Sequence, residues 1–276
     1  MALISNGCEN AFLHGSLTED VYIQPPLGLP TPPESVCHLR RAIYGLKQAP
    51  RAWFECFRQA IISFGFQQST KAGFQDSLHD HPHISFQESF QDHSLFVRTS
   101  PQGRVLILLY VDDMIITGDD TTGIVDTQKY LYRQFQIKDL GRLRYFLGLE
   151  IAQADRGILI SQQKYTSDII ASAALTDTRT TDTPLELHSK LLPTDGAPLA
   201  DPTRYRQLVG QLVYLCLTRP DIAHAVSIVS QFVSAPHSAH YSALLRILRY
   251  LRGIITRSLF MSSTSPLELR AYSDAD

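Results

Sequence analysis

Apolar residues form short continuous runs in the first half of the chain and recur at helical spacing in the second half. The runs at 95–98, 105–111 and 114–117 have the composition of buried β-strands. Shorter runs predict further β-structure: a strand and turn at 7–13, a hairpin of 146–151 with 158–161, and a last strand at 267–272. The chain therefore opens with a region rich in strands.

Two helices are predicted within this first region. The pattern predicts a helix over 49–65, with Trp53 and Phe57 on its apolar face. Thr121 or Thr122 can cap a second helix, because hydroxyl side chains accept hydrogen bonds from exposed backbone N–H groups at helix starts. Helices placed between strands indicate a mixed α and β fold.

The second half is predicted to be mostly helical. Apolar stripes indicate helices over 205–215, 222–232 and 241–251, and Thr218 is expected to cap the second of them. The polar, proline-containing segment 177–202 is interpreted as a linker.

A repetitive segment interrupts the first half. Four degenerate copies of a Phe-Gln tetrad begin at Phe66, Phe74, Phe86 and Phe90, with His79, His81 and His83 between them. Metal binding by the histidines is one interpretation. We favour an inserted loop at about 66–92, produced by local duplication.

The acid pair Asp112-Asp113 is the strongest chemical signal. It separates two apolar runs and is therefore expected at the tight end of a hairpin. Adjacent carboxylates repel each other, and divalent magnesium, which prefers oxygen ligands, can neutralise them. The plain alternative is a hairpin turn whose acids face water.

Composition is ordinary for a globular protein: 276 residues, 44% apolar, 19% charged, formal charge −2. The charge is unevenly spread, because seven arginines between 204 and 257 face a single acid, Asp221. A basic half can follow phosphates, although a solvated helix surface gives the same pattern. Four scattered cysteines without metal-ligand spacing are read as reduced thiols. Since no signal peptide or membrane-length apolar run is visible, we expect an intracellular protein of the cytoplasm or nucleus, away from membranes.

Several motifs occur together in a fixed order. They are Asn10 to Gly15, Tyr44 to Trp53, Tyr110 to Asp113, Lys138 to Gly141, Tyr145 to Ile151, Tyr205 to Gly210, Thr218 to Ile222 and Tyr272 to Asp276. This series resembles the reverse transcriptase of copia-type LTR retrotransposons, over nearly the whole chain. The inserted loop departs from that family pattern.

The resemblance implies an α+β right-hand polymerase palm, in which helices back an antiparallel sheet that carries the Tyr-Val-Asp-Asp hairpin. It implies a partial palm at 1–152 with most of the fingers missing, a mostly helical thumb and connection at 153–262, and a ribonuclease H stub at 263–276. The implied function is RNA-directed DNA polymerase, a nucleotidyltransferase of the DNA/RNA polymerase superfamily. Its implied partners are an RNA or DNA template with primer, deoxynucleoside triphosphates, and other polyprotein segments or subunits.

Site residues follow from the same resemblance. Asp112 and Asp113 are implied as catalytic ligands of two Mg²⁺ or Mn²⁺ ions that activate the primer hydroxyl and hold the triphosphate. Phe12 matches the aromatic gate that favours deoxynucleotides, and Asp274 matches a metal ligand of the ribonuclease H remnant. Contacts with nucleotide or primer-template are implied for Tyr110, Gly45, Lys47, Gln48, Arg51, Leu147 and Gly148.

The family's third metal-binding carboxylate falls at Gly7, which has no side chain. On a continuous strand Glu9 would share the face of Gly7 but lie roughly 6.6 Å further along, so we do not expect it to substitute. We therefore expect this copy to be catalytically impaired. Two alternatives remain open: a non-catalytic fragment that binds nucleic acid through the arginine-rich half, and a degenerate retroelement relic that does not fold stably.

Overall fold

The computed structural model describes residues 2–69, 94–186 and 190–266, apart from 29, 31 and 33. The chain divides into two compact units, Met1–Leu143 and Arg144–Asp276, which are described separately. The boundary expected at 152 lies inside a strand of the second unit, Leu149–Ala154.

The first unit is built on an antiparallel sheet of six strands. Their order across the sheet is β4-β5-β6-β7-β1-β8. The strands are β1 (Ala2–Gly7), β4 (Gln67–Gln68), β5 (Leu95–Ser100), β6 (Gly103–Tyr110), β7 (Asp113–Gly118) and β8 (Lys138–Arg142). The predicted strands at 95–98, 105–111 and 114–117 are thus present, and β1 lies between two strands that are far from it in sequence.

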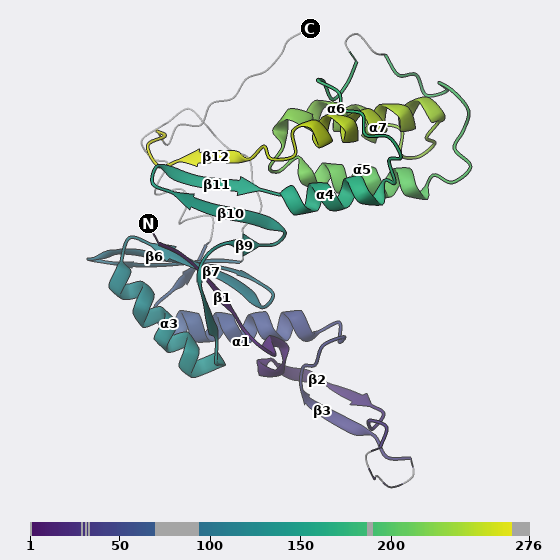
Figure 1. Ribbon diagram of the computed structural model, residues 1–276. Helices are drawn as coiled ribbons and strands as arrows, with labels where there is room; N and C mark the ends of the chain where they lie inside the picture. The colour runs from purple at the N-terminus through teal and green to yellow at the C-terminus, as the bar shows by residue number, and fades with distance from the viewer. Residues whose placement is uncertain are drawn as a thin grey trace, which may run out of the picture. The chain divides into compact units, whose positions relative to one another are not determined.

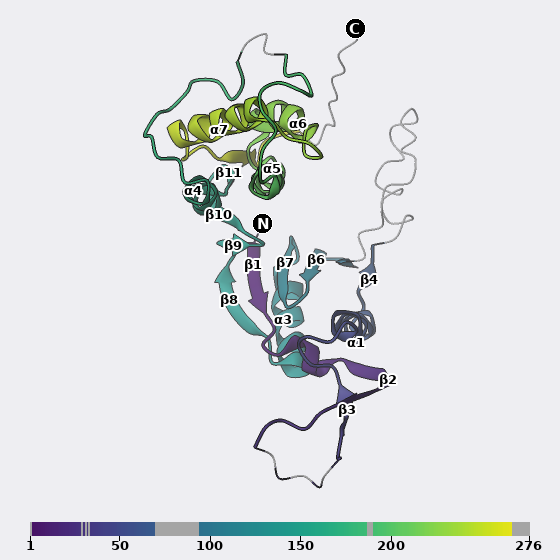
Figure 2. The same cartoon turned by 90° about the vertical axis from the view of Figure 1, so that its right-hand side faces the viewer.

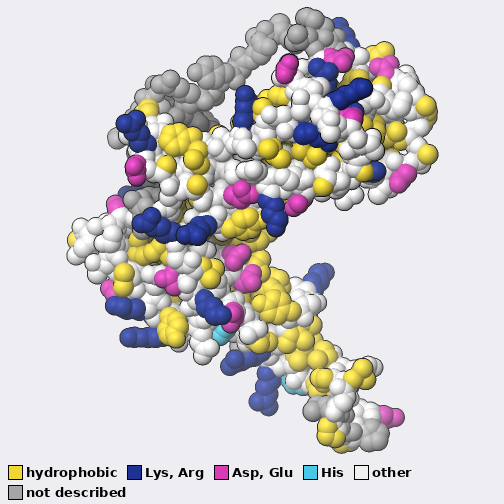
Figure 3. All heavy atoms as spheres, viewed as in Figure 1, with side chains coloured by type: hydrophobic (Ala, Val, Ile, Leu, Met, Phe, Trp, Pro, Cys, Tyr) yellow, Lys and Arg dark blue, Asp and Glu magenta, His cyan; other side chains and the backbone are white. Residues whose placement is uncertain are grey.

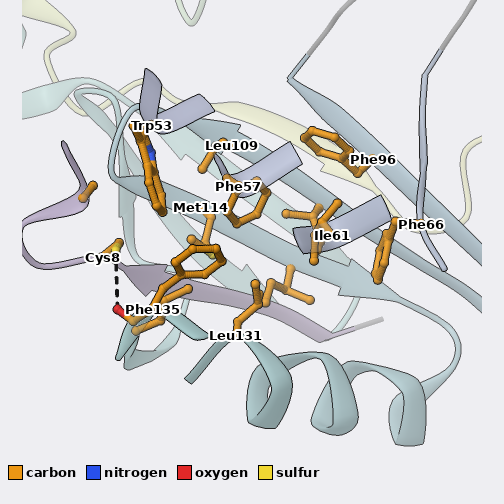
Figure 4. Packing of buried hydrophobic residues seen from close by; sticks show 14 of the residues in the cluster. Cys8, Trp53, Phe57, Ile61, Phe66, Phe96, Leu109, Met114, Leu131 and Phe135 are labelled. Carbon is orange, nitrogen blue, oxygen red and sulfur yellow. Dashed lines mark hydrogen bonds between the residues drawn. The ribbon is translucent and has the colours of Figure 1, made fainter. Parts of the chain in front are cut away.

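Two helices, α1 (Ala49–Ser63) and α3 (Thr121–Phe135), cover the same face of this sheet (Figure 1). Their aromatic side chains meet above it, and the rings of Phe57 and Phe135 stack with centroids 5.8 Å apart. Trp53 also packs against Phe135 (Figure 4). This core fixes the helices against β6 and β7, the strands of the acid hairpin.

Two further strands extend from the first unit. After the 3-10 helix η1 (Ala11–His14), β2 (Ser16–Ile23) and β3 (Cys37–Arg41) form a two-stranded sheet (Figure 2). Hydrophobic side chains are exposed along this extension (Figure 3), with Tyr22, Leu27 and Val36 among them.

The second unit combines a four-stranded antiparallel sheet with a helical bundle. The sheet order is β12-β11-β10-β9. The strands are β9 (Tyr145–Phe146), β10 (Leu149–Ala154), β11 (Gly157–Ser161) and β12 (Leu259–Ser262). The helices are α4 (Gln163–Ser172), α5 (Thr203–Leu215), the short 3-10 helix η2 (Pro220–Ile222), α6 (Ala223–Ser230) and α7 (Ser238–Gly253). Tyr205 is fully buried in the bundle, where its hydroxyl donates to the Val229 carbonyl over 2.6 Å.

Three local predictions are wrong. The first strand ends at Gly7 and Ala11–His14 is a 3-10 helix, so Glu9 lies in a turn. Asp120 caps α3 instead of a threonine, because its carboxylate accepts from the Gly123 N–H. Thr218 caps no helix, since its hydroxyl donates to the buried Gln162 side chain over 2.8 Å.

Other predictions lie outside the described residues: the tetrad loop beyond Ser69 with its histidines, the strand at 267–272 and Asp274. The four cysteines are unpaired. Within the described ranges, no helix has the length and apolarity needed to cross a membrane.

Candidate functional site

The acid pair lies at the tip of the β6–β7 hairpin. Tyr110 pairs with Asp113, so Val111 and Asp112 form a two-residue turn. Val111 has φ of 55° while Asp112 has no positive φ, which is the pattern of a type II′ turn. A β-branched residue rarely adopts a positive φ, and such a conformation costs about 1–3 kcal/mol. The hairpin tip therefore stores backbone strain that its surroundings must hold.

Two hydrogen bonds hold this turn. The Trp53 indole Nε1–H donates to the Val111 carbonyl over 2.5 Å, and the Cys8 backbone N–H donates to the Asp112 carbonyl over 2.9 Å. Trp53 belongs to α1 and Cys8 follows β1. The helix that packs on the hairpin and the strand that pairs with it therefore each provide one donor to its tip. The sequence indicates Trp53 only as a core residue, and its donor role depends on tertiary contact.

Gly7, on strand β1, lies beside the acid pair at the start of the adjacent strand β7. Its register partner on β7 is Asp113, and paired residues of antiparallel strands share one face. A Cβ atom built on Gly7 would meet only the Leu140 Cδ1 atom within 4 Å, at an ordinary contact distance of 3.5 Å. The backbone here thus has room for a carboxylate side chain beside Asp113.

The negative charge of Asp112 affects the pKa values of the neighbouring groups at the hairpin tip. Burial, together with the neighbouring charge of Asp112, raises the pKa of Asp113 above its ordinary value. Burial and then the Asp112 charge raise the pKa of the Cys8 thiol to about 11. This thiol is buried and points toward the Phe135 carbonyl at 3.7 Å (Figure 4), so it is a neutral packing group.

The donor set fits only part of a two-ion centre. Among the described residues, no group of three histidine, cysteine or acidic side chains is placed to hold a metal ion. Glu9 is turned away, because its carboxylate pairs with the Lys138 ammonium group. Asp112 and Asp113 offer carboxylate oxygens that suit magnesium, whereas Gly7, where the family resemblance predicts a third carboxylate, has no side chain.

Phe12 is buried in the core of the first unit. It belongs to η1, is 8% exposed, and its ring lies 4.5 Å from that of Tyr44, measured between centroids. The half-exposed Tyr44 ring covers one side of it.

The segment from Gly45 to Arg51 leads into α1. Gly45 has φ of 94°, a conformation that favours glycine. Lys47, Gln48 and Arg51 line a groove of about 600 Å³ between the start of α1 and β2, together with Glu19. Two cationic side chains thus face one groove beside α1.

Leu147 and Gly148 form the turn between β9 and β10 in the second unit. Their φ angles of 50° and 81° match a type I′ turn, which joins Phe146 to Leu149. The Tyr214 hydroxyl of α5 donates to the Leu147 carbonyl. The hydroxyl oxygen and the Cε1 ring atom of Tyr214 would lie 3.7 Å and 3.9 Å from a Cβ placed on Gly148. Sequence reasoning does not identify this contact, because Tyr214 is distant in the chain and lies off the apolar stripe of its helix.

The seven arginines between 204 and 257 are engaged by the protein itself. Arg249 and Arg252 lie 2.7 Å and 3.6 Å from Asp177, and Arg246 lies 3.2 Å from Glu186. The others also contact this unit: Arg204 donates to Ser172, Arg206 to Val233 and Ser234, Arg219 to Asp221 and Ile254, and Arg257 lies 3.9 Å from Asp221. Their placement agrees with a structural role for the basic half, in which the linker at 177–186 docks on α7.

Comparison with known proteins decides the family. The profile described as "Reverse transcriptase (RNA-dependent DNA polymerase)" matches residues 6–187. The chain belongs to the reverse transcriptase family. It is 41% identical to the retrovirus-related Pol polyprotein of transposon RE1 from Arabidopsis thaliana over 97% of the chain, which corresponds to 17% of that relative. It is 35% identical to the Pol polyprotein of transposon TNT 1-94 from Nicotiana tabacum, again over 97% of the chain.

A shorter relative matches across most of its own length. The chain is 31% identical to the putative transposon Ty5-1 protein YCL074W from Saccharomyces cerevisiae, covering 97% of the chain and 82% of that protein. By contrast, the chain spans about a sixth of the RE1 polyprotein. The resemblance to copia-type retrotransposons is therefore confirmed at the level of family.

Proposed function

We propose that this chain is the polymerase part of a copia-type Pol polyprotein whose nucleotidyl-transfer step is impaired by Gly7. At the level of the family its function is RNA-directed DNA polymerase. The observation that carries the impairment is the register: Gly7 lies across from Asp113, where a third carboxylate would complete the metal set.

The proposal assigns the first unit to a polymerase palm. An antiparallel sheet with two helices on one face and an acid pair at the tip of its central β6–β7 hairpin agrees with this assignment. The second unit is assigned to the thumb and connection, with its β9–β10 turn at Leu147 and Gly148 gripping the primer end. Lys47, Gln48 and Arg51 are assigned to phosphates of template or nucleotide, and Phe12 with Tyr110 to the nucleotide.

The chemistry explains why one missing side chain matters. Phosphoryl transfer depends on neutralising charge in the transition state, and bound divalent ions supply that neutralisation in polymerases. Two carboxylates at a strained turn hold less cationic charge than three. If the loss is about 3–4 kcal/mol of transition-state stabilisation, the rate falls about 100-fold to 1,000-fold, because each 1.4 kcal/mol is worth tenfold.

Two observations bear on the alternatives. The seven arginines between 204 and 257 have internal partners, which argues against a nucleic-acid surface there. Both units have dense cores with fully buried side chains such as Trp53, Phe57 and Tyr205, which argues against an unfolded relic.

Primer extension on an RNA template with magnesium tests the proposal. We expect little synthesis by the unaltered chain, recovery of at least tenfold in Gly7→Asp, and no recovery in Gly7→Asn, which has the same size without the charge. Asp112→Asn in the Gly7→Asp background should abolish the recovered synthesis. Efficient synthesis by the unaltered chain would contradict the impairment.

A further inference from the structure

The first unit holds a cavity of about 570 Å³ between α3 and the strands β1 and β8. This volume lies within the range of roughly 300–1,000 Å³ that is typical of ligand sites. Besides Leu131, the α3 residues that line it recur at positions i, i+3, i+4, i+7 and i+8: Val125, Gln128, Lys129, Tyr132 and Arg133. A second face of α3, beside the one that packs into the core, is thus turned toward this cavity.

Asn6 gives the cavity a buried hydrogen-bond donor. This residue of β1 is 3% exposed and lines the cavity, and its Nδ2 group has no hydrogen-bond partner among the residues that the structure describes. Its other amide atom, Oδ1, accepts only a long bond of 3.4 Å from Gln128 Nε2. A buried donor without a partner lowers the stability of the fold, so an acceptor placed inside the cavity would bind favourably to this nitrogen. Because side chains alternate along β1, Asn6 lies on the face of the sheet opposite to Gly7.

Positive charge gathers at the same cavity. Lys129, Arg133 and Lys138 line it with one carboxylate, Asp139, which accepts from the Gly141 N–H. Lys138 pairs with Glu9, and Lys129 lies 3.9 Å from Asp126. Within the described part of the chain, no carboxylate lies within ion-pair distance of the Arg133 guanidinium.

We propose that this cavity binds a flat, apolar organic acid that carries an oxygen acceptor at the end remote from its carboxylate. The rings pack against Val125, Tyr132 and Leu140, the acceptor meets the Asn6 amide, and the carboxylate meets Arg133. Gln128, which contacts Asn6, and Arg133 are five residues apart, about 7.5 Å along the helix axis. A skeleton of two fused rings with a substituent at each end suits this separation.

The test uses 6-acetyl-2-naphthoate as the probe, with binding to the full chain measured by calorimetry. Two analogues separate the contributions: 6-ethyl-2-naphthoate lacks the acceptor, and 6-acetyl-2-naphthamide lacks the charge. We expect saturable one-to-one binding of the probe, about threefold to tenfold weaker for each analogue, in line with one hydrogen bond or one partly exposed ion pair.

Variants then connect each contribution to a residue. Asn6→Leu should remove the preference for acetyl over ethyl, and the exposed Arg133→Gln should remove the preference for carboxylate over amide. Arg156→Gln, in the second unit, is the matched control and should bind as the unaltered chain does. Thermal unfolding of each variant verifies that it is folded, and Arg133→Gln tests the proposal even if Asn6→Leu does not fold. Absence of saturable binding, or preferences that survive in both variants, overturns the proposal.

Discussion

At the scale of single residues, the hairpin tip combines strain with like charge. Val111 holds a positive φ that suits glycine better, and Asp112 and Asp113 follow it. The Trp53 indole and the Cys8 backbone bind the two carbonyls of the turn. We infer that these contacts fix the carboxylates in place, because strain of this kind persists only where neighbours maintain it.

Replacing Trp53 tests the support of the turn. Trp53→Phe keeps an aromatic ring in the core but removes the donor to the Val111 carbonyl. We expect a loss of about 1–3 kcal/mol in the free energy of unfolding, from the lost bond and the smaller ring. Urea denaturation measures it. Phe57→Leu, which replaces another buried aromatic ring of α1 with a smaller apolar side chain, is the control. Only Trp53→Phe should increase hydrogen exchange at the hairpin tip.

The raised pKa of Asp113 predicts a dependence of stability on pH. Because the folded pKa lies above the unfolded value, the unfolded state loses its proton first as pH rises, and stability falls through this window. Asp113→Asn should therefore raise the melting temperature at pH 7 by about 1–2 °C, a size usual for surface changes. The gain should vanish below the ordinary pKa of an aspartate side chain, about 3.9. An equal gain at both pH values would contradict this account.

At the scale of elements, the sequence predicts what local pattern encodes. The apolar runs of β6 and β7 and the helical spacing of α1 are visible without a structure. Strand β8 is not, because all five of its residues are exposed and it forms by pairing with the free edge of β1. The strand β12 is missed for a similar reason, since it completes the second sheet beside β11.

The candidate site also has features that the sequence predicts and features that only tertiary contacts create. The acid pair, and the missing ligand position that we propose at Gly7, can be inferred from sequence spacing and family resemblance. The partners of the site cannot, because Trp53, Cys8 and Tyr214 come from other elements and act through backbone carbonyls. The arginine-rich half is misleading in sequence, since Asp177 and Glu186 lie far from α7 along the chain.

Tyr214 provides a test at this scale. Tyr214→Phe removes the hydroxyl that holds the β9–β10 turn, whose Leu147 has a positive φ. We expect amide exchange in β9 and β10 to accelerate about twofold to tenfold, the equivalent of one hydrogen bond. Tyr165→Phe is the control, because that ring packs edge-on against Tyr214 at 5.5 Å. Equal acceleration in both variants would assign the effect to general loosening of the aromatic pair.

At the scale of the whole molecule, each unit has its own core, and charge is used differently in the two. In the first unit, Lys47 and Arg51 line a groove, whereas arginines of the second unit make internal pairs. Binding to a primer-template duplex should therefore depend on the first pair.

Salt dependence of binding distinguishes the two regions. Lys47→Gln combined with Arg51→Gln should weaken binding and reduce the slope of log affinity against log salt by about two, one for each lost phosphate contact. Arg246→Gln combined with Arg249→Gln should leave the slope unchanged while lowering stability. Fluorescence anisotropy at several salt concentrations measures the slope. If the slope fell in the Arg246 and Arg249 variant but not in the Lys47 and Arg51 variant, the arginine-rich half would be the binding surface.

Metal binding tests the central claim most directly, because it requires neither template nor synthesis. Calorimetric titration with Mn²⁺ should show weak binding to the unaltered chain, binding at least tenfold tighter to Gly7→Asp, and no gain in Gly7→Asn. That result would place the defect of this chain at one missing carboxylate across from Asp113. Equally tight binding by the unaltered chain and Gly7→Asp would contradict the account, because another group would then complete the site.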